Sequence, residues 1–156
     1  MTRHRQAIAL LALVGLFVAL YLWLYKIGAI GELKCGTGAC EQVQTSRYAE
    51  FLGIPVALYG VVGYAALLGV ALVGLQPAFL LKRGPTLLLA GLSSVGVAFT
   101  GYLTYLELFV IHAICRWCVV SAVIITVIWV VSLGAGVSSR YLESDAPAGH
   151  DWASRP

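Results

Sequence analysis

Residues 115–137 read CRWCVVSAVIITVIWVVSLGAGV, an almost uninterrupted apolar run in which Arg116 is the single charged residue. A helix that crosses the hydrocarbon core of a bilayer needs about 20 mostly apolar residues. The run therefore predicts a membrane-spanning helix with Cys115 and Cys118 in its first turn.

Three further apolar runs of similar length extend over about 7–25, 54–75 and 85–111. Hydrophobic residues make up 60% of the 156-residue chain and charged residues 11%, against about 25% charged residues in a typical soluble protein. This composition excludes a soluble domain, and the scattered Lys and Arg residues argue against nucleic-acid binding. We therefore predict an all-α integral membrane four-helix bundle over residues 1–137 and a polar cytoplasmic tail over 138–156.

The first run could instead be a cleaved signal peptide, because it follows a basic start. It is longer than the usual apolar core of a signal peptide, and no clear A-x-A cleavage site follows it. We therefore expect a retained helix.

Four spans place both termini on the same side of the membrane. The basic residues expected on that side are Arg3, Arg5, Lys82, Arg83, Arg140 and Arg155, whereas the other side has Lys34, Arg47 and Arg116, with Lys26 at the boundary. The bias predicts cytoplasmic termini in the cell inner membrane. All four cysteines then lie on the extracytoplasmic side, where disulfides persist.

Cys115 and Cys118 are three residues apart, so they share one face of the predicted helix. Unpaired N–H groups and the helix dipole stabilise a thiolate at a helix N-terminus. A cysteine in that position has a lowered pKa and attacks disulfides readily. The pair is thus suited to redox chemistry, although a structural disulfide or two inert thiols are open alternatives.

The second pair lies in the loop Cys35-Gly-Thr-Gly-Ala-Cys40. Gly36 and Gly38 allow a tight turn, so the two cysteines can reach disulfide distance. Because so short a loop gains little stability from closure, a disulfide here indicates thiol exchange. The competing interpretation is a zinc site with four thiolate ligands, which the hydrophobic setting and oxidising compartment disfavour; we expect no metal.

Three parts of the sequence together resemble the bacterial branch of the vitamin K epoxide reductase family. They are Cys35…Cys40-Glu-Gln-Val-Gln-Thr-Ser46-Arg-Tyr48…Gly53-Ile-Pro55-Val56…Gly60, then Tyr105-Leu-Glu107, then Cys115-Arg-Trp-Cys118-Val-Val-Ser121-Ala122. The resemblance covers nearly the whole chain up to the polar tail. Ala122 stands where the animal enzymes have a tyrosine, which favours plain quinone reduction over epoxide reduction.

The resemblance implies a four-helix bundle around a quinone, either ubiquinone or menaquinone/vitamin K. It implies that Cys115 and Cys118 are the active pair, with Cys118 nearest the quinone. Cys35 and Cys40 would carry electrons inward from a thiol partner, with Cys40 attacking Cys115. A short cap helix over about 41–52 would cover the pocket, its apolar side formed by Val43, Tyr48 and Phe51.

Other residues are candidates for contact with the quinone or for proton transfer. The candidates for contact are Ser46, Phe51, Tyr102 and Tyr105. Ser46 could instead cap a turn, and aromatic packing accounts equally well for the tyrosines. Glu107 or His112 could relay the protons that quinone reduction needs, since ionisable residues in membranes are often functional; the alternative is an interfacial residue that faces water.

The function expected from these features is a membrane thiol:quinone oxidoreductase that supports disulfide-bond formation. Its partner would be a separate periplasmic thioredoxin-fold protein of the DsbA type, and membrane lipid would surround the bundle. Two alternatives stay open. One is a non-enzymatic membrane carrier that binds metal through the same thiols. The other is the unrelated DsbB-type disulfide oxidase, in which the C-x-x-C pair lies in the first loop.

Overall fold

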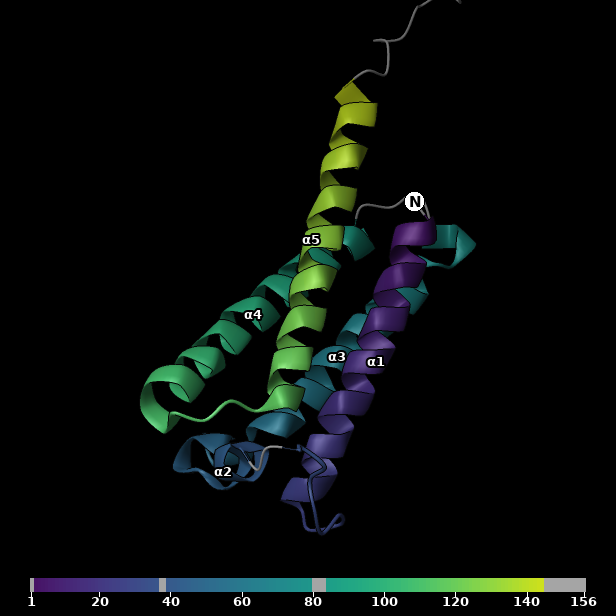
Figure 1. Ribbon diagram of the computed structural model, residues 1–156. Coiled ribbons are helices and arrows are strands. Elements are labelled where there is room, and N and C mark those ends of the chain that lie inside the picture. Colours follow the sequence, from purple (N-terminus) through teal and green to yellow (C-terminus); the bar gives the residue numbers. More distant parts are fainter. Residues whose placement is uncertain (1, 37–38, 80–83, 145–156) are drawn as a thin grey trace, which may run out of the picture.

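Four long helices form the protein in a computed structural model that describes residues 2–36, 39–79 and 84–144 (Figure 1). They are α1 (Thr2–Lys26), α3 (Val56–Gly74), α4 (Gly84–Leu106) and α5 (Arg116–Ser144). In these described ranges, four segments are long and apolar enough to cross a membrane: Arg3–Lys26, Val56–Gly74, Gly84–Ile111 and Arg116–Gly136. The prediction of an all-α membrane bundle is confirmed.

The fourth helix is longer than the apolar run suggested. It continues to Ser144, seven residues past Val137, so the first part of the predicted polar tail is helical. The rest of that tail, and Lys82 and Arg83, lie outside the described residues. The N-terminus and the far end of α5 lie at one end of the bundle (Figure 1).

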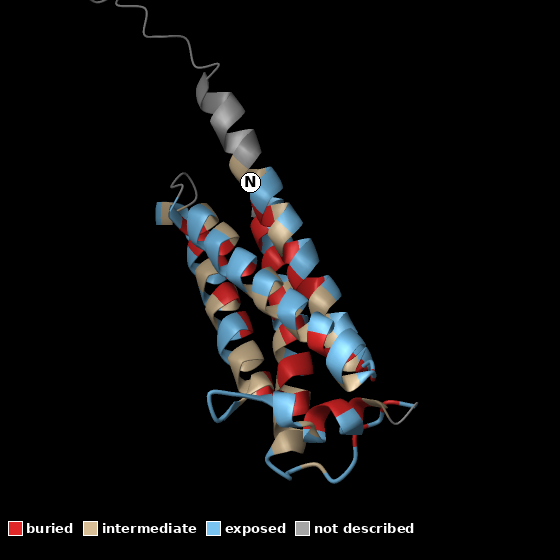
Figure 2. Ribbon diagram, turned by 90° about the vertical axis from the view of Figure 1, so that its left-hand side faces the viewer, coloured by how far each residue is buried: buried red, intermediate tan, exposed pale blue. Residues whose placement is uncertain are grey.

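Buried and exposed residues alternate along each long helix (Figure 2). Many of the exposed residues are large and apolar. The central core includes Ile8 and Ala12 from α1, Leu67 from α3, Leu89 from α4 and Ile128 from α5. Large apolar residues such as Leu10, Phe17, Val62 and Val95 are more than half exposed. An outer surface of this kind is compatible with lipid, because acyl chains solvate it as well as a protein core would.

Two helix pairs approach closely through glycines. A Cβ on Gly15 of α1 would lie 2.3 Å from the Tyr64 ring of α3, and one on Gly96 of α4 would lie 2.8 Å from the Ile125 side chain of α5. Small residues let backbones approach in membranes, where packing rather than water exclusion holds helices together. Gly15 thus makes the space that Tyr64 occupies.

Arg5 is a buried cation at the end of the bundle that holds the N-terminus. Its guanidinium donates hydrogen bonds to the carbonyl oxygens of Gly74 and Phe79 and to Thr86 Oγ1. Phe79 belongs to the short helix η2 (Pro77–Phe79) between α3 and α4. Arg5 therefore ties α1 to the α3–α4 connection, a structural role in addition to its part in the charge bias.

The segment between α1 and α3 forms a cap at the opposite end of the bundle (Figure 1). It comprises α2 (Ala39–Thr45), the 3-10 turn η1 (Arg47–Ala49) and two short antiparallel strands, β1 (Glu50–Phe51) and β2 (Ile54–Pro55). The expected single cap helix over 41–52 is wrong in its second half. The helix α2 ends at Thr45. The next residue, Ser46, donates both its N–H and its Oγ–H to the Val43 carbonyl.

The strands are joined by a tight turn at Leu52 and Gly53, whose φ angles are +55° and +76°. Two positive φ values suit a two-residue hairpin turn, but they are uncommon for leucine. Leu52 is 83% exposed at the tip. Phe51 is the last residue of β1, directly before the turn. Its ring lies against α3 and α4.

Candidate functional site

The two cysteine pairs lie together at the end of the bundle that carries the cap. Cys35 and Cys40 form a disulfide with Cα atoms 6.0 Å apart, whereas Cys115 and Cys118 are free thiols. Cys35, Cys40 and Cys115 are all at least 95% buried and belong to one packed cluster with Leu22 of α1. The fold thus brings the loop disulfide into one cluster with Cys115 and Cys118, which are far from it in the sequence.

The loop has the turn that its glycines predicted. Gly36 has a φ of +71°, and Gly38 lies outside the described residues. A Cβ on Gly36 would lie 3.4 Å from a guanidinium nitrogen of Arg116. Arg116 therefore lies against the disulfide loop. In the sequence it stands between Cys115 and Cys118.

Cys118 lies in the first turn of α5, as the sequence predicted, whereas Cys115, which was expected in the same turn, immediately precedes the helix. The Cys115 carbonyl accepts the Val119 N–H at 3.0 Å, which begins the helix. The Cys118 thiol and, more weakly, the N–H groups of Trp117 and Cys118 stabilise the Cys115 thiolate, so the pKa of Cys115 is lowered. A lowered pKa favours the thiolate form, which reacts in disulfide exchange.

Glu107 is the carboxylate of this site. It is 6% exposed, and its Oε2 accepts the Cys115 backbone N–H at 3.2 Å. Glu107 begins η3 (Glu107–Ile111), a π-helical turn that extends α4. Such turns add a residue to the helix and often occur at functional sites. Here the turn directs Glu107 inward, whereas His112, at a φ of +52°, ends the turn as an exposed residue.

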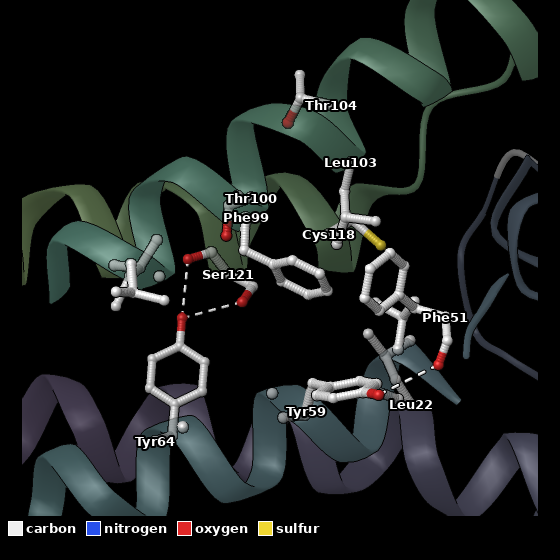
Figure 3. Close-up of a pocket in the computed structure, with 18 of the residues that line it drawn as sticks. Leu22, Phe51, Tyr59, Tyr64, Phe99, Thr100, Leu103, Thr104, Cys118 and Ser121 are labelled. Carbon is white, nitrogen blue, oxygen red and sulfur yellow. Dashed lines mark hydrogen bonds between the residues drawn. The ribbon is translucent and has the colours of Figure 1, made fainter. Parts of the chain in front are cut away.

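An apolar cavity of about 410 Å³ lies between the helices beneath the cap (Figure 3). Cys118 and Glu107 are in its wall, and Phe51 closes it from the cap side. The labelled lining residues in Figure 3 are Leu22, Phe51, Tyr59, Tyr64, Phe99, Thr100, Leu103, Thr104, Cys118 and Ser121. Its size is within the range of small-molecule sites, about 300–1,000 Å³.

Three aromatic rings from different elements meet in the cavity wall. The Phe51 ring of β1 lies 6.1 Å from Tyr59 of α3 and 6.0 Å from Phe99 of α4, between ring centroids. The Tyr59 hydroxyl also donates to the Phe51 carbonyl at 3.2 Å. Edge-to-face contacts at these distances are favourable, so the cluster fastens the cap to both helices.

The structure separates the quinone-contact candidates. Phe51 lines the cavity, whereas Ser46, Tyr102 and Tyr105 are not part of its lining. Tyr102 and Tyr105 are 49% and 56% exposed, on faces of α4 that do not line this cavity. On the cap, Val43 is buried, but Tyr48 is 43% exposed and does not belong to an inward apolar side.

Several lining residues were not predicted. They are Leu22, Gln44, Tyr59, Tyr64, Phe99 and Ser121. Tyr64 donates to the Ser121 carbonyl at 2.9 Å and shares a second 2.9 Å hydrogen bond with its Oγ. Ser121 falls within the motif that begins at Cys115, and Gln44 falls within the stretch that begins at Cys40. Leu22, Tyr59, Tyr64 and Phe99 become neighbours only through helix packing.

The cavity fits a quinone. Its walls are mainly aliphatic and aromatic with a few polar groups, as a flat ring with two carbonyls and an apolar tail requires. Cys118 is the thiol in the wall, and Cys115 is behind it in the cluster with the loop disulfide. The residues that would hold the ring are Phe51, Tyr59 and Phe99.

Comparison with known families is consistent with this geometry. The model of the vitamin K epoxide reductase family matches residues 6–133, most of the chain. The protein belongs to the vitamin K epoxide reductase family. Members are quinone-linked membrane thiol oxidoreductases that typically act with thioredoxin-like partners. The chain is thus a multi-pass membrane oxidoreductase, and the DsbB-type interpretation is set aside.

Proposed function

We propose that the protein oxidises a separate extracytoplasmic thioredoxin-fold dithiol and reduces a membrane quinone, supporting disulfide-bond formation. One observation carries this proposal: Cys118 lines the apolar cavity while Cys115 is packed in one cluster with the Cys35–Cys40 disulfide. The active pair therefore has a lipid-soluble acceptor site on one side and a thiol-exchange partner on the other.

Electrons move through two thiol–disulfide exchanges. The reduced partner attacks the Cys35–Cys40 disulfide and leaves as an oxidised protein, and the loop pair becomes a dithiol. The Cys40 thiolate then attacks Cys115 of a Cys115–Cys118 disulfide, and Cys118 leaves as a thiolate. Cys35 attacks Cys40 of this mixed disulfide, which re-forms the loop disulfide and releases Cys115. Each exchange forms one S–S bond and breaks another.

Oxidation of the Cys115–Cys118 dithiol completes the cycle. A bound quinone supplies an acceptor for two electrons and two protons. Cys118, in the cavity wall, is the sulfur placed for this transfer, and Phe51 holds the cap over the site. Glu107 lines the same cavity and bonds to Cys115, so we propose it, rather than the exposed His112, as the group that moves the protons.

We further propose that both termini face the cytoplasm of a bacterium and that the cap faces the periplasm. The cysteines and the cap lie at the end of the bundle opposite the N-terminus (Figure 1). The basic residues expected at the N-terminal end exceed those at the cap end, and this bias favours the same orientation.

A purified sample tests the function directly. With a dithiol reductant, we expect loss of the quinone absorbance of decyl-ubiquinone or a short-chain menaquinone, one quinone per dithiol oxidised. The faster of the two identifies the preferred quinone. Stoichiometric zinc binding without turnover would instead support the metal carrier and overturn the proposal.

Replacing Glu107 separates proton transfer from positioning. Glu107→Gln keeps an oxygen that can accept the Cys115 N–H but cannot carry a proton. We expect quinone reduction to slow about 100-fold, the usual size of a general acid–base contribution. His112→Gln, outside the cavity, should change the rate little. A wild-type rate in Glu107→Gln would show that the carboxylate only positions Cys115.

A further inference from the structure

Gln44 is a polar residue of the cavity to which the exchange steps assign no part. It belongs to α2, it is 7% exposed, and it is part of the cavity lining. Within the described part of the chain, its recorded hydrogen bond uses the backbone carbonyl, and none involves the side-chain amide. Among the described residues, every fully buried side-chain nitrogen or oxygen has a hydrogen-bond partner, so the Gln44 amide atoms are not fully enclosed by protein. An unbonded amide on a residue of the cavity wall has room to bond a ligand.

Three other polar groups of the wall already have protein partners, and the hydroxyls of Thr100 and Thr104 also line the cavity. Tyr59 donates to the Phe51 carbonyl, Tyr64 bonds to Ser121, and Glu107 accepts the Cys115 N–H. Gln44 is different, because its amide offers both two N–H donors and a carbonyl acceptor.

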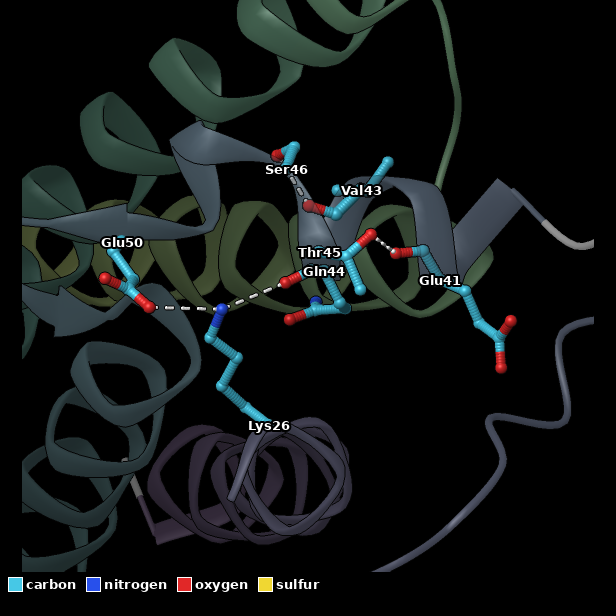
Figure 4. A network of polar contacts seen from close by, with 7 residues as sticks. All are labelled: Lys26, Glu41, Val43, Gln44, Thr45, Ser46 and Glu50. Carbon is cyan, nitrogen blue, oxygen red and sulfur yellow. Dashed lines mark hydrogen bonds and ion pairs between the residues drawn. The ribbon is translucent and has the colours of Figure 1, made fainter. Parts of the chain in front are cut away.

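The backbone of Gln44 is fastened to α1 by Lys26 (Figure 4). Lys26 Nζ donates to the Gln44 carbonyl at 3.2 Å and pairs with the Glu50 carboxylate, also at 3.2 Å. One cation thus joins the end of α1 to α2 and to β1, the strand that carries Phe51. A side chain on a backbone held in this way is pre-organised, so less entropy is lost when it bonds a ligand.

We propose that the Gln44 side-chain amide donates a hydrogen bond to a carbonyl oxygen of the quinone and that Lys26 positions it. This inference rests on the proposed function. The amide suits both ends of the reaction, because its N–H bonds a quinone carbonyl and its oxygen accepts a quinol hydroxyl. The cap thereby contributes a polar contact to the site in addition to covering it.

The test uses purified protein with dithiol and decyl-ubiquinone. In Gln44→Leu we expect the KM for decyl-ubiquinone to rise about 3- to 12-fold, the usual net value of one hydrogen bond, with kcat within about twofold of wild type. Gln44→Glu removes the N–H donors without changing shape and should raise KM similarly. Lys26→Met should raise it less. Val43→Ala is the control, since Val43 is a buried α2 residue outside the cavity lining.

Infrared spectra of bound decyl-ubiquinone give a readout that general loosening of the cap would not reproduce. A hydrogen bond lowers the stretching frequency of one carbonyl, and this shift should disappear in Gln44→Leu and Gln44→Glu but persist in Val43→Ala. Unchanged KM and an unchanged carbonyl band in both Gln44 variants would overturn the inference. If wild-type protein reduces no quinone, the proposed function itself fails.

Discussion

Replacing Cys118 by alanine is expected to reduce dithiol-dependent quinone turnover to the uncatalysed background. Cys118 is the thiol in the cavity wall, so its loss removes the sulfur that faces the electron acceptor. Cys115→Ala should have the same effect, because a single remaining thiol cannot form the intramolecular disulfide that two-electron oxidation requires. The measurement is the steady-state rate of quinone absorbance loss with each purified variant.

Ser132→Ala is a matched control for these substitutions. Ser132 is buried in the same helix, α5, where its hydroxyl donates to the Ile128 carbonyl one turn earlier at 2.7 Å. It is not part of the cavity lining, so we expect near-normal turnover. If Cys115→Ala or Cys118→Ala also turned over at a near-normal rate, the assignment of the active pair would be rejected.

The sequence alone was enough to predict the four-helix bundle and to place Cys115 and Cys118 at the start of the last span. Spans are set by a solvent requirement, since every backbone polar group in lipid must bond internally, and long apolar runs satisfy it as helices. Cys115 and Cys118 follow directly from the start of the last run. These features depend on local composition, so they can be predicted from a single sequence.

The cap and much of the cavity lining depend on tertiary contacts. The segment 46–55 has weak periodicity, and its path is set by Ser46 bonding to Val43, by the turn at Leu52, and by the Lys26 tie to Glu50. The direction in which α4 rotates decides that Phe99 faces inward while Tyr102 faces outward. Most positions around α4 are apolar or small, so its sequence pattern reports this rotation only weakly.

The sequence suggested that the loop cysteines form a mobile shuttle, but their burial limits which of them a partner protein can reach. Both loop cysteines are buried, Cys40 completely and Cys35 to 96%. Attack by a protein partner requires a sulfur that its thiolate can reach in line with the S–S bond. Cys35 is the more accessible of the two, and it lies in the loop rather than in α2. This favours Cys35 as the sulfur attacked by the partner and Cys40 as the one that turns inward.

A Cys35→Ala/Cys118→Ala double mutant treated with a thiol oxidant such as diamide is therefore expected to accumulate a Cys40–Cys115 disulfide. The expected bond joins two fully buried residues of one packed cluster, Cys40 and Cys115. With Cys35 absent, nothing resolves the bond from the loop side, and with Cys118 absent, nothing resolves it from the helix side. Non-reducing peptide mapping should show most molecules with one cross-link between the first loop and α5.

The reciprocal mutant, Cys40→Ala/Cys118→Ala, decides the order of transfer. It leaves Cys35 and Cys115, which share the same cluster and can therefore also come within disulfide distance, with Cα atoms under about 7 Å apart. Accumulation must for this reason be compared as a rate under one oxidant, not as presence or absence. We expect the Cys40–Cys115 bond to form faster, because Cys40 is carried on α2, which Lys26 holds against α1. Faster formation of Cys35–Cys115 would reverse the roles of the two loop cysteines while leaving Cys115 as the residue that receives the electrons.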